Sequence, residues 1–184
     1  MSPDRPRRAD AQRNYDLLLA AAKKIFAERG VDAPLDDIAK LAGVGNATMY
    51  RHFPTRSDVI VAVFSDEVAE LCAQGEALLG ESSSADALFS WLRLFIAHVA
   101  GKRELALAVA DDRGAQQSGL FASWHKAMVS AASALLATAQ HDGVVRADVE
   151  VLDLLTLANG LSVTGADPVR VERLVALIRR GTQH

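Results

Sequence analysis

The sequence predicts an all-α protein of about nine helices, and three features of the chain indicate this fold. Apolar residues recur at helical spacing in almost every segment, whereas alternating strand patterns are nearly absent. Half of the 184 residues are hydrophobic, which gives the chain enough apolar surface for a sizeable core. Glycine, proline and capping residues divide the periodic stretches into lengths that are typical of helices.

The first two helices are expected close to the N-terminus. The apolar face of the first ends at Phe26, and Gly30 follows as a stop signal. The second covers 35–42, because Pro34 stands at its start and Gly43 lies just beyond its end. These signals predict a long helix and a short one, joined by a brief loop.

The third and fourth helices are expected after a tight glycine turn. Asn46 is placed to cap the third helix, and Tyr50 and Phe53 should face inward from it. The proline that follows ends this helix. Thr55 and Asp58 then form a T-x-x-D capping box for the fourth helix, which should fade at its later glycines.

Five further helices are expected beyond the polar linker "GESSSA". A break at Gly101 separates the fifth helix from a short sixth over "RELALAVA", and the loop "DDRGAQQSG" precedes the seventh. Asp148 starts the eighth helix, while Asp167 and Pro168 supply the cap and first position of the ninth. The expected ranges are 88–100, 103–110, 120–140, 148–163 and 168–178.

Charge divides the chain into a basic end and an acidic remainder. Residues 1–56 hold 10 Lys and Arg against 7 Asp and Glu, whereas residues 57–184 hold 10 against 16. Arg5, Arg7 and Arg8 follow no amphipathic pattern, so we expect them to form an arm without helical structure. The split favours an anion-binding domain over 1–56 and a second domain over 57–184. The alternative for the arm is an ordinary solvated tail.

Several classes of protein are disfavoured by what the sequence lacks. The lone Cys72 cannot form an internal disulfide, and no apolar run is long enough to cross a membrane, so we expect a cytoplasmic protein. Signal-peptide, phosphate-loop, serine-nucleophile and zinc-protease motifs are missing. His98 and His125 have no Cys or carboxylate at ligand spacing. We therefore expect neither a metal, a cofactor nor catalytic activity.

The two short helices between Pro34 and Pro54 indicate a role in binding DNA. Neither could be stable alone, so both must pack on their neighbours. Two such helices joined by a glycine turn form a helix-turn-helix unit, whose second helix enters the major groove. Side chains on and just after this second helix offer hydroxyl, aromatic and donor groups to phosphates and base edges. These candidate DNA-contacting residues are Thr48, Tyr50, Arg51, His52 and Arg56.

The stretch "PLDDIAKLAGVGNATMYRHFPTRSDVI" resembles the DNA-binding domain of TetR-type transcriptional regulators, whose core reads I-A-x-x-A-G-V-x-x-x-T-x-Y-x-H-F. The resemblance covers residues 14–62. It implies that the third helix and Arg56 lie at the DNA, and it adds Asn46 and Ala47 near base edges. Many family members begin the second helix with two threonines, one of which touches phosphate. This chain has proline and leucine there, which puts that contact in doubt.

The second predicted domain carries aromatic residues at helical spacing, which either fill a plain core or line a ligand cavity. The candidates for the cavity are Phe64, Trp91, Phe95, His98, Phe121, Trp124 and Met128. The resemblance to TetR-type regulators adds weight to the cavity but leaves both interpretations open.

The eighth and ninth helices carry more apolar surface than the core of one small subunit needs, which predicts a homodimer. The candidate interface residues are Leu154, Leu157, Ala158, Leu161, Leu174 and Ile178.

These features together predict a one-component transcriptional regulator. The specific hypothesis is a ligand-responsive repressor that binds a palindromic operator in double-stranded DNA as a homodimer. An unidentified small molecule in the C-terminal domain would shift the spacing of the two DNA-reading helices, with the fourth helix as the lever. The competing hypothesis is an all-helical ligand-binding or interaction protein without specific DNA binding, and a small helical enzyme is a weaker third.

Overall fold

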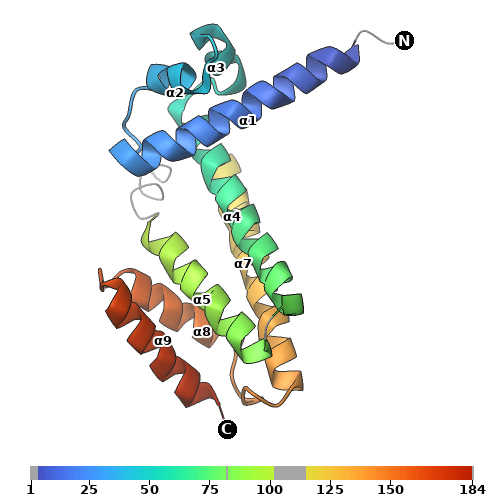
Figure 1. The fold of residues 1–184 in the computed structure, drawn as a ribbon, viewed down its shortest axis with the longest axis vertical. Helices are drawn as coiled ribbons and strands as arrows, with labels where there is room; N and C mark the ends of the chain where they lie inside the picture. The colour runs from blue at the N-terminus through green and yellow to red at the C-terminus, as the bar shows by residue number, and fades with distance from the viewer. Residues whose placement is uncertain (1–3, 82, 102–114, 184) are drawn as a thin grey trace. The chain divides into compact units, whose positions relative to one another are not determined.

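The computed structural model describes residues 4–81, 83–101 and 115–183, and within these ranges every regular element is an α-helix (Figure 1). The helices are α1 (Asp4–Arg29), α2 (Leu35–Ala42), α3 (Asn46–His52), α4 (Arg56–Glu81), α5 (Ser84–Ala100), α7 (Ala115–His141), α8 (Val151–Ser162) and α9 (Pro168–Thr182). The all-α class is thereby confirmed. The sixth predicted helix falls outside the described residues. None of the described helices has the length and apolar character needed to cross a membrane.

The chain forms two compact units, and the boundary between them falls inside α4, between Asp66 and Glu67. The N-terminal unit holds α1, α2, α3 and the first part of α4. The C-terminal unit holds the rest of α4 together with α5, α7, α8 and α9. The domain boundary that the sequence suggests after residue 56 stays a prediction.

The core of the N-terminal unit draws on all of its helices. Leu18 of α1, Ile38 of α2, Met49 of α3 and Val59 of α4 are each fully buried. Short helices such as α2 and α3 are marginal in isolation, so this shared core is what keeps them helical. An ion pair between Lys23 and Asp66, with 2.5 Å between Nζ and Oδ2, joins α1 to α4 within the unit.

In the C-terminal unit, α5 is the central helix and packs against α7, α8 and α9. Its Trp91 is fully buried and donates a hydrogen bond of 2.9 Å from Nε1 to the carbonyl of Leu71 in α4. Gly75 makes this approach possible, because a Cβ atom there would lie only 3.0 Å from the indole nitrogen. The indole ring also stacks on Phe95, with 5.7 Å between ring centroids.

Two capping predictions are confirmed. The amide of Asp58 donates to Thr55 Oγ1 over 3.2 Å, and the amide of Thr55 donates to Asp58 Oδ2 over 2.8 Å, which completes the capping box of α4. At α9, Asp167 Oδ1 accepts a 2.9 Å hydrogen bond from the amide of Arg170, and Pro168 occupies the first helical position.

Several predicted helix ends were wrong. Asn46 is the first residue of α3 and does not cap it, since Gly45 holds the cap position without any side-chain bond. Helix α7 begins at Ala115, inside the predicted loop, because alanine and glutamine propagate a helix without an apolar face. Helix α8 begins at Val151 and not at Asp148, whose carboxylate is held by Arg146.

The ends of α4 and α5 also differ from the prediction. Helix α4 continues through both of its later glycines to Glu81, and α5 already begins at Ser84. The polar linker is therefore much shorter than "GESSSA" suggests. Ser83 explains why α5 begins so early, because its side chain accepts from the amide of Asp86 and caps the new helix.

Candidate nucleic-acid interface

The turn between α2 and α3 is set by a glycine in a left-handed conformation. Gly43 has φ 70° and ψ 25°, a backbone conformation that residues with a Cβ atom disfavour. The amide of Val44 then donates to the carbonyl of Ala39 over 3.0 Å, which ends α2 within a single turn. The chain enters α3 at Asn46, only three residues after Gly43.

Helix α3 is attached to the unit by one face and exposes the other. Met49 is fully buried and Phe53, just past the helix, is 3 % exposed, so these two residues hold α3 to the core. Asn46, Ala47 and Arg51 are exposed.

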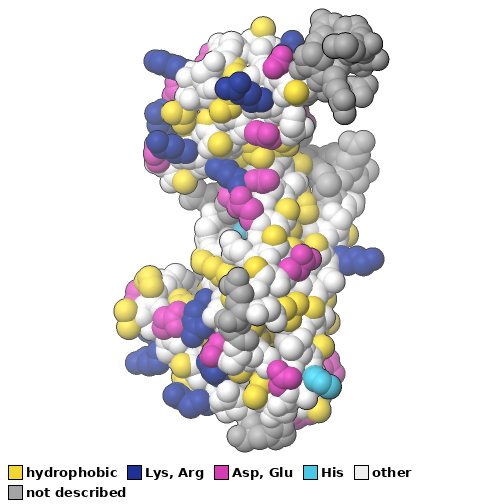
Figure 2. All heavy atoms as spheres, turned by 45° about the vertical axis from the view of Figure 1, so that its right-hand side comes forward, with side chains coloured by type: hydrophobic (Ala, Val, Ile, Leu, Met, Phe, Trp, Pro, Cys, Tyr) yellow, Lys and Arg dark blue, Asp and Glu magenta, His cyan; other side chains and the backbone are white. Residues whose placement is uncertain are grey.

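On the face of the molecule in Figure 2, Lys and Arg side chains of the N-terminal unit lie interspersed with acidic ones.

The inward-facing pair is therefore Met49 with Phe53, and not Tyr50 with Phe53 as the spacing suggested. Tyr50 is 47 % exposed, and its hydroxyl lies 3.4 Å from Asp36 Oδ1 of α2, at the outer limit of a hydrogen bond. The core role expected for Phe53 is confirmed. The second acidic residue of α2, Asp37, accepts from Arg29 over 2.7 Å.

His52 lies in an aromatic cluster at the end of α3. Its ring centroid is 6.2 Å from that of Tyr15 and 6.4 Å from that of Phe53, and Tyr15 and Phe53 are themselves 5.3 Å apart. The Nε2 atom is buried and has no hydrogen-bond partner among the described residues. Burial raises the pKa of the Tyr15 phenol, and the carboxylates of Asp66 and Asp16 raise it further. Part of His52 thus belongs to the core.

Two family models match the chain, on either side of residue 70. The model of "Bacterial regulatory proteins, tetR family" matches residues 18–63, and that of "Transcriptional regulator SbtR-like, C-terminal domain" matches residues 83–184, more than half of the chain. The chain belongs to the TetR family of transcriptional regulators. The resemblance seen in the helix-turn-helix sequence is thereby confirmed.

Solved structures of TetR regulators share this fold along nearly the whole chain. The TetR transcriptional regulator SCO0520 from Streptomyces coelicolor is 36% identical with a TM-score of 0.78, and the match covers 91% of this chain and 97% of that one. A TetR transcription regulatory protein from Mycobacterium vanbaalenii is 33% identical with a TM-score of 0.78, over 96% and 99% of the two chains.

Curated relatives match over a shorter stretch. The HTH-type transcriptional regulator SAR0097 of Staphylococcus aureus is 32% identical over 82 residues, which is 43% of this chain. The match spans only 42% of that relative's own length, and 34% of the length of a second regulator, SAUSA300_2515, from the same organism.

Arg56, which the TetR resemblance places at the DNA backbone, has a bonding role inside the unit. Its guanidinium is half-buried, and Nη1 donates to the carbonyls of Val31 and Ala33 over 2.5 Å and 2.7 Å. These bonds tie the loop before α2 to the first turn of α4. Arg56 therefore fixes the position of the helix-turn-helix unit within the N-terminal core.

The prediction that the basic arm has no helical structure is wrong. Helix α1 extends back to Asp4, so the backbone of Arg5, Arg7 and Arg8 is helical. Alanine and arginine are both strong helix formers, which allows a helix without an apolar face to continue here. The positions of these three side chains lie outside the described part of the structure.

The TetR C-terminal unit contains a pocket of about 310 Å³ between α5, α7 and α8. Its apolar lining comprises Phe95, Val99, Met128, Val129, Leu152 and Leu155, and its polar lining comprises His125, Thr156 and Asn159. Two of the predicted lining residues, Phe95 and Met128, are among them. Trp91 and Trp124 are buried, Phe64 and His98 are half-buried, and none of these four lines this pocket. The side chain of Phe121 lies outside the described residues.

The predicted dimer surface on α8 and α9 is only partly available to a partner. Leu154 and Ala158 are 2 % and 1 % exposed, so they belong to the core of a single chain and correct that part of the prediction. Leu161, Leu174 and Ile178 are half-buried. The more exposed apolar side chains on and around these helices are Leu152, Leu157, Val163, Val169 and Leu177.

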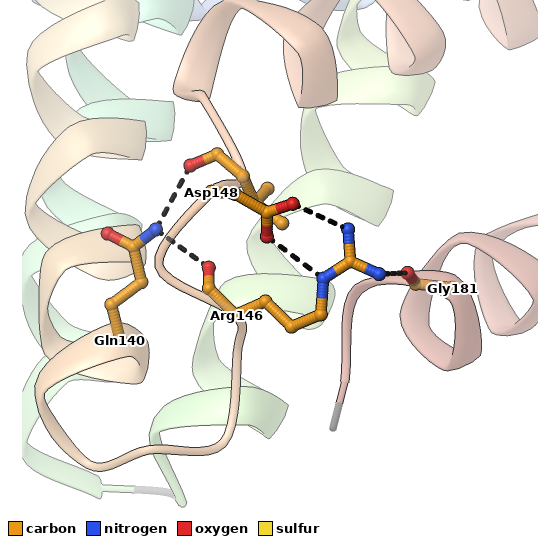
Figure 3. Close-up of polar contacts among 5 residues, drawn as sticks. Gln140, Arg146, Asp148 and Gly181 are labelled. Atoms are coloured by element: carbon orange, nitrogen blue, oxygen red, sulfur yellow. Dashed lines mark hydrogen bonds and ion pairs between the residues drawn. The ribbon is translucent and has the colours of Figure 1, made fainter.

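A polar cluster fixes the C-terminal end of α9 against the connection between α7 and α8 (Figure 3). Arg146 holds Asp148 through two bonds of 2.9 Å, and its Nη1 donates to the carbonyl of Gly181 over 3.3 Å. Its own amide donates to the carbonyl of Thr182 over 2.9 Å. Gln140 donates to the carbonyl of Arg146 over 3.0 Å. The last turn of α9 thus receives partners for carbonyls that the helix itself cannot satisfy.

The described residues show no cluster of His, Cys, Asp or Glu that could hold a metal ion. The exposed face of α3 instead offers hydrogen-bond donors, a phenol and a methyl group. These are groups that contact phosphates and base edges in DNA, and they stand on a helix that the surrounding core holds in place.

Proposed function

We propose that this TetR regulator is a homodimeric repressor that binds a palindromic operator and is released by a small molecule. The observation that supports it best is the division of α3 into two faces. Met49 is buried, while Asn46, Ala47, Tyr50 and Arg51 stand exposed on a helix of seven residues. A helix held on one side and polar on the other can be placed in the major groove without unfolding its support.

The exposed groups suit different features of the groove. Arg51 carries a guanidinium that can contact guanine or a phosphate, and Asn46 carries an amide that suits adenine. The methyl group of Ala47 can pack against the methyl group of thymine. These residues provide direct reading of bases, whereas the arginines near the start of α1 provide contacts to phosphates.

Tyr50 is expected to exchange partners when DNA binds. Its hydroxyl lies 3.4 Å from the Asp36 carboxylate, which is a long and therefore weak hydrogen bond. A phosphate oxygen that comes within about 2.8 Å of the hydroxyl would make a shorter hydrogen bond than this one. The carboxylate of Asp36 then lies close to the DNA. Because its negative charge repels phosphates, we expect it to favour operator sequences whose phosphates lie farther from it.

The homodimer is expected to form through α8 and α9. Leu157 is 52 % exposed and Leu177 is 50 % exposed, although both are large apolar side chains. A symmetric interface would cover each of them twice, once in each subunit. Two copies would then offer two α3 helices to successive major grooves, about one helical turn apart.

The small molecule is expected to bind in the C-terminal unit and to act through α4, which contributes residues to both units. It would shift the equilibrium between two arrangements of the dimer only if it bound one of them more tightly. The protein acts in this proposal by binding alone, without catalysis, on DNA in the cytoplasm.

The decisive experiment selects DNA fragments with the purified protein and then measures mobility shifts on the selected sequence. Arg51→Ala should weaken specific binding by about 1–3 kcal/mol through a lost base contact. Tyr50→Phe should weaken binding to all sequences by roughly 1–3 kcal/mol through a lost hydrogen bond to phosphate. Lys126→Ala, which removes an exposed cationic side chain of α7 and leaves α3, α8 and α9 unchanged, is the matched control and should leave affinity unchanged. Failure to enrich any sequence with folded protein would favour the competing interpretation of a ligand-binding protein without specific DNA binding.

The basic start of α1 is tested by salt dependence. Removal of residues 1–8 should weaken binding to all sequences alike, because phosphate contacts carry no sequence information. Each lost contact should reduce the slope of log affinity against log salt by about 0.9. An unchanged slope would show that Arg5, Arg7 and Arg8 are only solvated residues.

A further inference from the structure

The pocket in the C-terminal unit has an apolar floor and a polar rim. Phe95 and Leu155 are each 7 % exposed and form its most buried part. His125, Thr156 and Asn159 are exposed and lie at its opening, on α7 and α8, together with the exposed apolar side chain of Leu152. A ligand that enters therefore meets three hydrogen-bonding side chains and one leucine at the opening, and only apolar surface in the most buried part.

We infer that this pocket takes an uncharged amphiphile, with an apolar body on the floor and one neutral hydrogen-bonding group at the rim. The inference rests on the proposed function, because it names the chemical class of the releasing molecule. Thr156 provides a hydroxyl and Asn159 provides both an acceptor and two donors, so a neutral hydroxyl, amide or carbonyl group finds partners there.

The lining of this pocket disfavours charged ligands. Among the lining residues that the structure describes, none is Lys, Arg, Asp or Glu, and His125 at the opening is the one side chain that can carry a charge. A carboxylate or ammonium group that moved onto the apolar floor would lose hydration without gaining a counter-charge there, which is strongly unfavourable. A neutral polar group loses far less, since one or two hydrogen bonds replace those it made to water.

The volume limits the size of the ligand. The pocket measures about 310 Å³, roughly twice the ~150 Å³ of an engineered cavity that binds benzene. It lies at the lower end of the roughly 300–1,000 Å³ that is usual for small-molecule sites. A medium-length aliphatic chain or a bicyclic ring system with one polar substituent fits this space.

The test uses octanol, octanoate and octylammonium, which share one apolar chain and differ in charge. Their affinities for the full-length protein are measured by titration calorimetry. Octanol should bind about tenfold or more tightly than either ion, because only the ions carry a charge into the pocket. Equal or tighter binding of octanoate or octylammonium would overturn the inference.

Variants show whether this pocket is the site. Thr156→Val should weaken octanol binding about fivefold through loss of one hydrogen bond, and Val129→Trp should abolish it by filling the pocket. Ser130→Val changes an exposed residue of α7 outside the lining and should leave binding unchanged. Octanol affinity that is the same in all three variants would overturn the assignment of the site.

Mobility shifts on the same preparations keep the two proposals apart. If the protein selects an operator but none of the three probes binds, the ligand class is overturned and the proposed regulator stands. If octanol binds as expected but no DNA sequence is enriched, the regulator is overturned and the pocket chemistry stands.

Discussion

The two units of this protein differ in how their functional surfaces are assembled. In the N-terminal unit, the exposed face of α3 comes from one stretch of chain, residues 46–51. In the C-terminal unit, the pocket draws on α5, α7 and α8, so its lining runs from Phe95 to Asn159 along the sequence. A surface made by one stretch depends on how that helix is held. A pocket made by three helices depends on how the helices pack together.

This difference leads to distinct sensitivities. Damage to the support of α3 should remove DNA binding while the pocket stays intact. Damage to the core around α5 should distort the pocket while the side chains of α3 stay in place. Four substitutions test this comparison, from the largest expected effect to the smallest.

The largest effect is expected for Trp91→Ala, in the core of the C-terminal unit. It removes a fully buried ring and should lower the free energy of unfolding by about 3–5 kcal/mol. Octanol binding should be lost as well, because Phe95 stacks on this ring. Chemical denaturation and calorimetry measure both quantities. Trp91→Phe is the control, and its free energy of unfolding should fall less than that of the alanine variant, by about 1 kcal/mol for the hydrogen bond to Leu71 together with the cost of a smaller cavity.

Met49→Ala should destabilise the N-terminal unit by about 2–5 kcal/mol, because the side chain is fully buried. Operator affinity should fall with it, since α3 loses the contact that holds it. Octanol affinity should stay at the wild-type value. Met49→Leu keeps the volume and should restore DNA binding. A variant that loses both binding activities equally would contradict the separation of the two units.

Gly43→Ala should destabilise the turn of the helix-turn-helix by about 1–2 kcal/mol, because φ is 70° there. Gly119→Ala is the matched control in α7, where no atom lies within 4 Å of an added Cβ. The free energy of unfolding of that variant should rise by about 0.5–1 kcal/mol, because alanine reduces the entropy of the unfolded chain. Thermal denaturation measures both, and the same sign for both variants would show that the turn conformation is not the cause.

The smallest effect is expected for Asp86→Asn, at the start of α5. Hydrogen bonds from Ser83 and Arg179, together with the charge of Arg179, lower the pKa of the Asp86 carboxyl in the folded chain. A lowered folded pKa stabilises the protein above the unfolded pKa of about 3.9, and this contribution fades as pH falls through the folded value. The thermal midpoint of the variant should therefore be slightly below that of the wild type at neutral pH and equal to it in acid. Asp153→Asn, at an exposed position of α8, serves as the control.

The sequence predicts the N-terminal unit well because its signals are local. Pro34 and Gly43 mark the ends of α2, and the capping box of Thr55 and Asp58 marks the start of α4. Met49 was missed, since a lone methionine in a short helix carries no periodic pattern. From the sequence, Tyr50 is as plausible an inward-facing residue as Met49. Only the packing of α3 shows that Met49 is the buried one.

The C-terminal unit was less predictable because its surfaces depend on contacts between distant segments. Aromatic spacing identifies Phe95 and Trp91 together, yet only the first lines the pocket. The polar rim was not predicted, since Thr156 and Asn159 stand out only once α7 and α8 are placed together. Leu154 was assigned to the dimer surface because a sequence does not show which apolar residues one chain already covers.

The position of Trp91 gives the protein a natural optical reporter. Its indole is buried and hydrogen-bonded, and it stacks on a residue that lines the pocket. Indole emission depends on the polarity and mobility of its surroundings, so occupation of the pocket should change the fluorescence spectrum without any added label. Trp124→Phe would remove the signal of the second tryptophan and leave Trp91 alone. Ligand arrival in the C-terminal unit could then be timed directly by stopped-flow fluorescence.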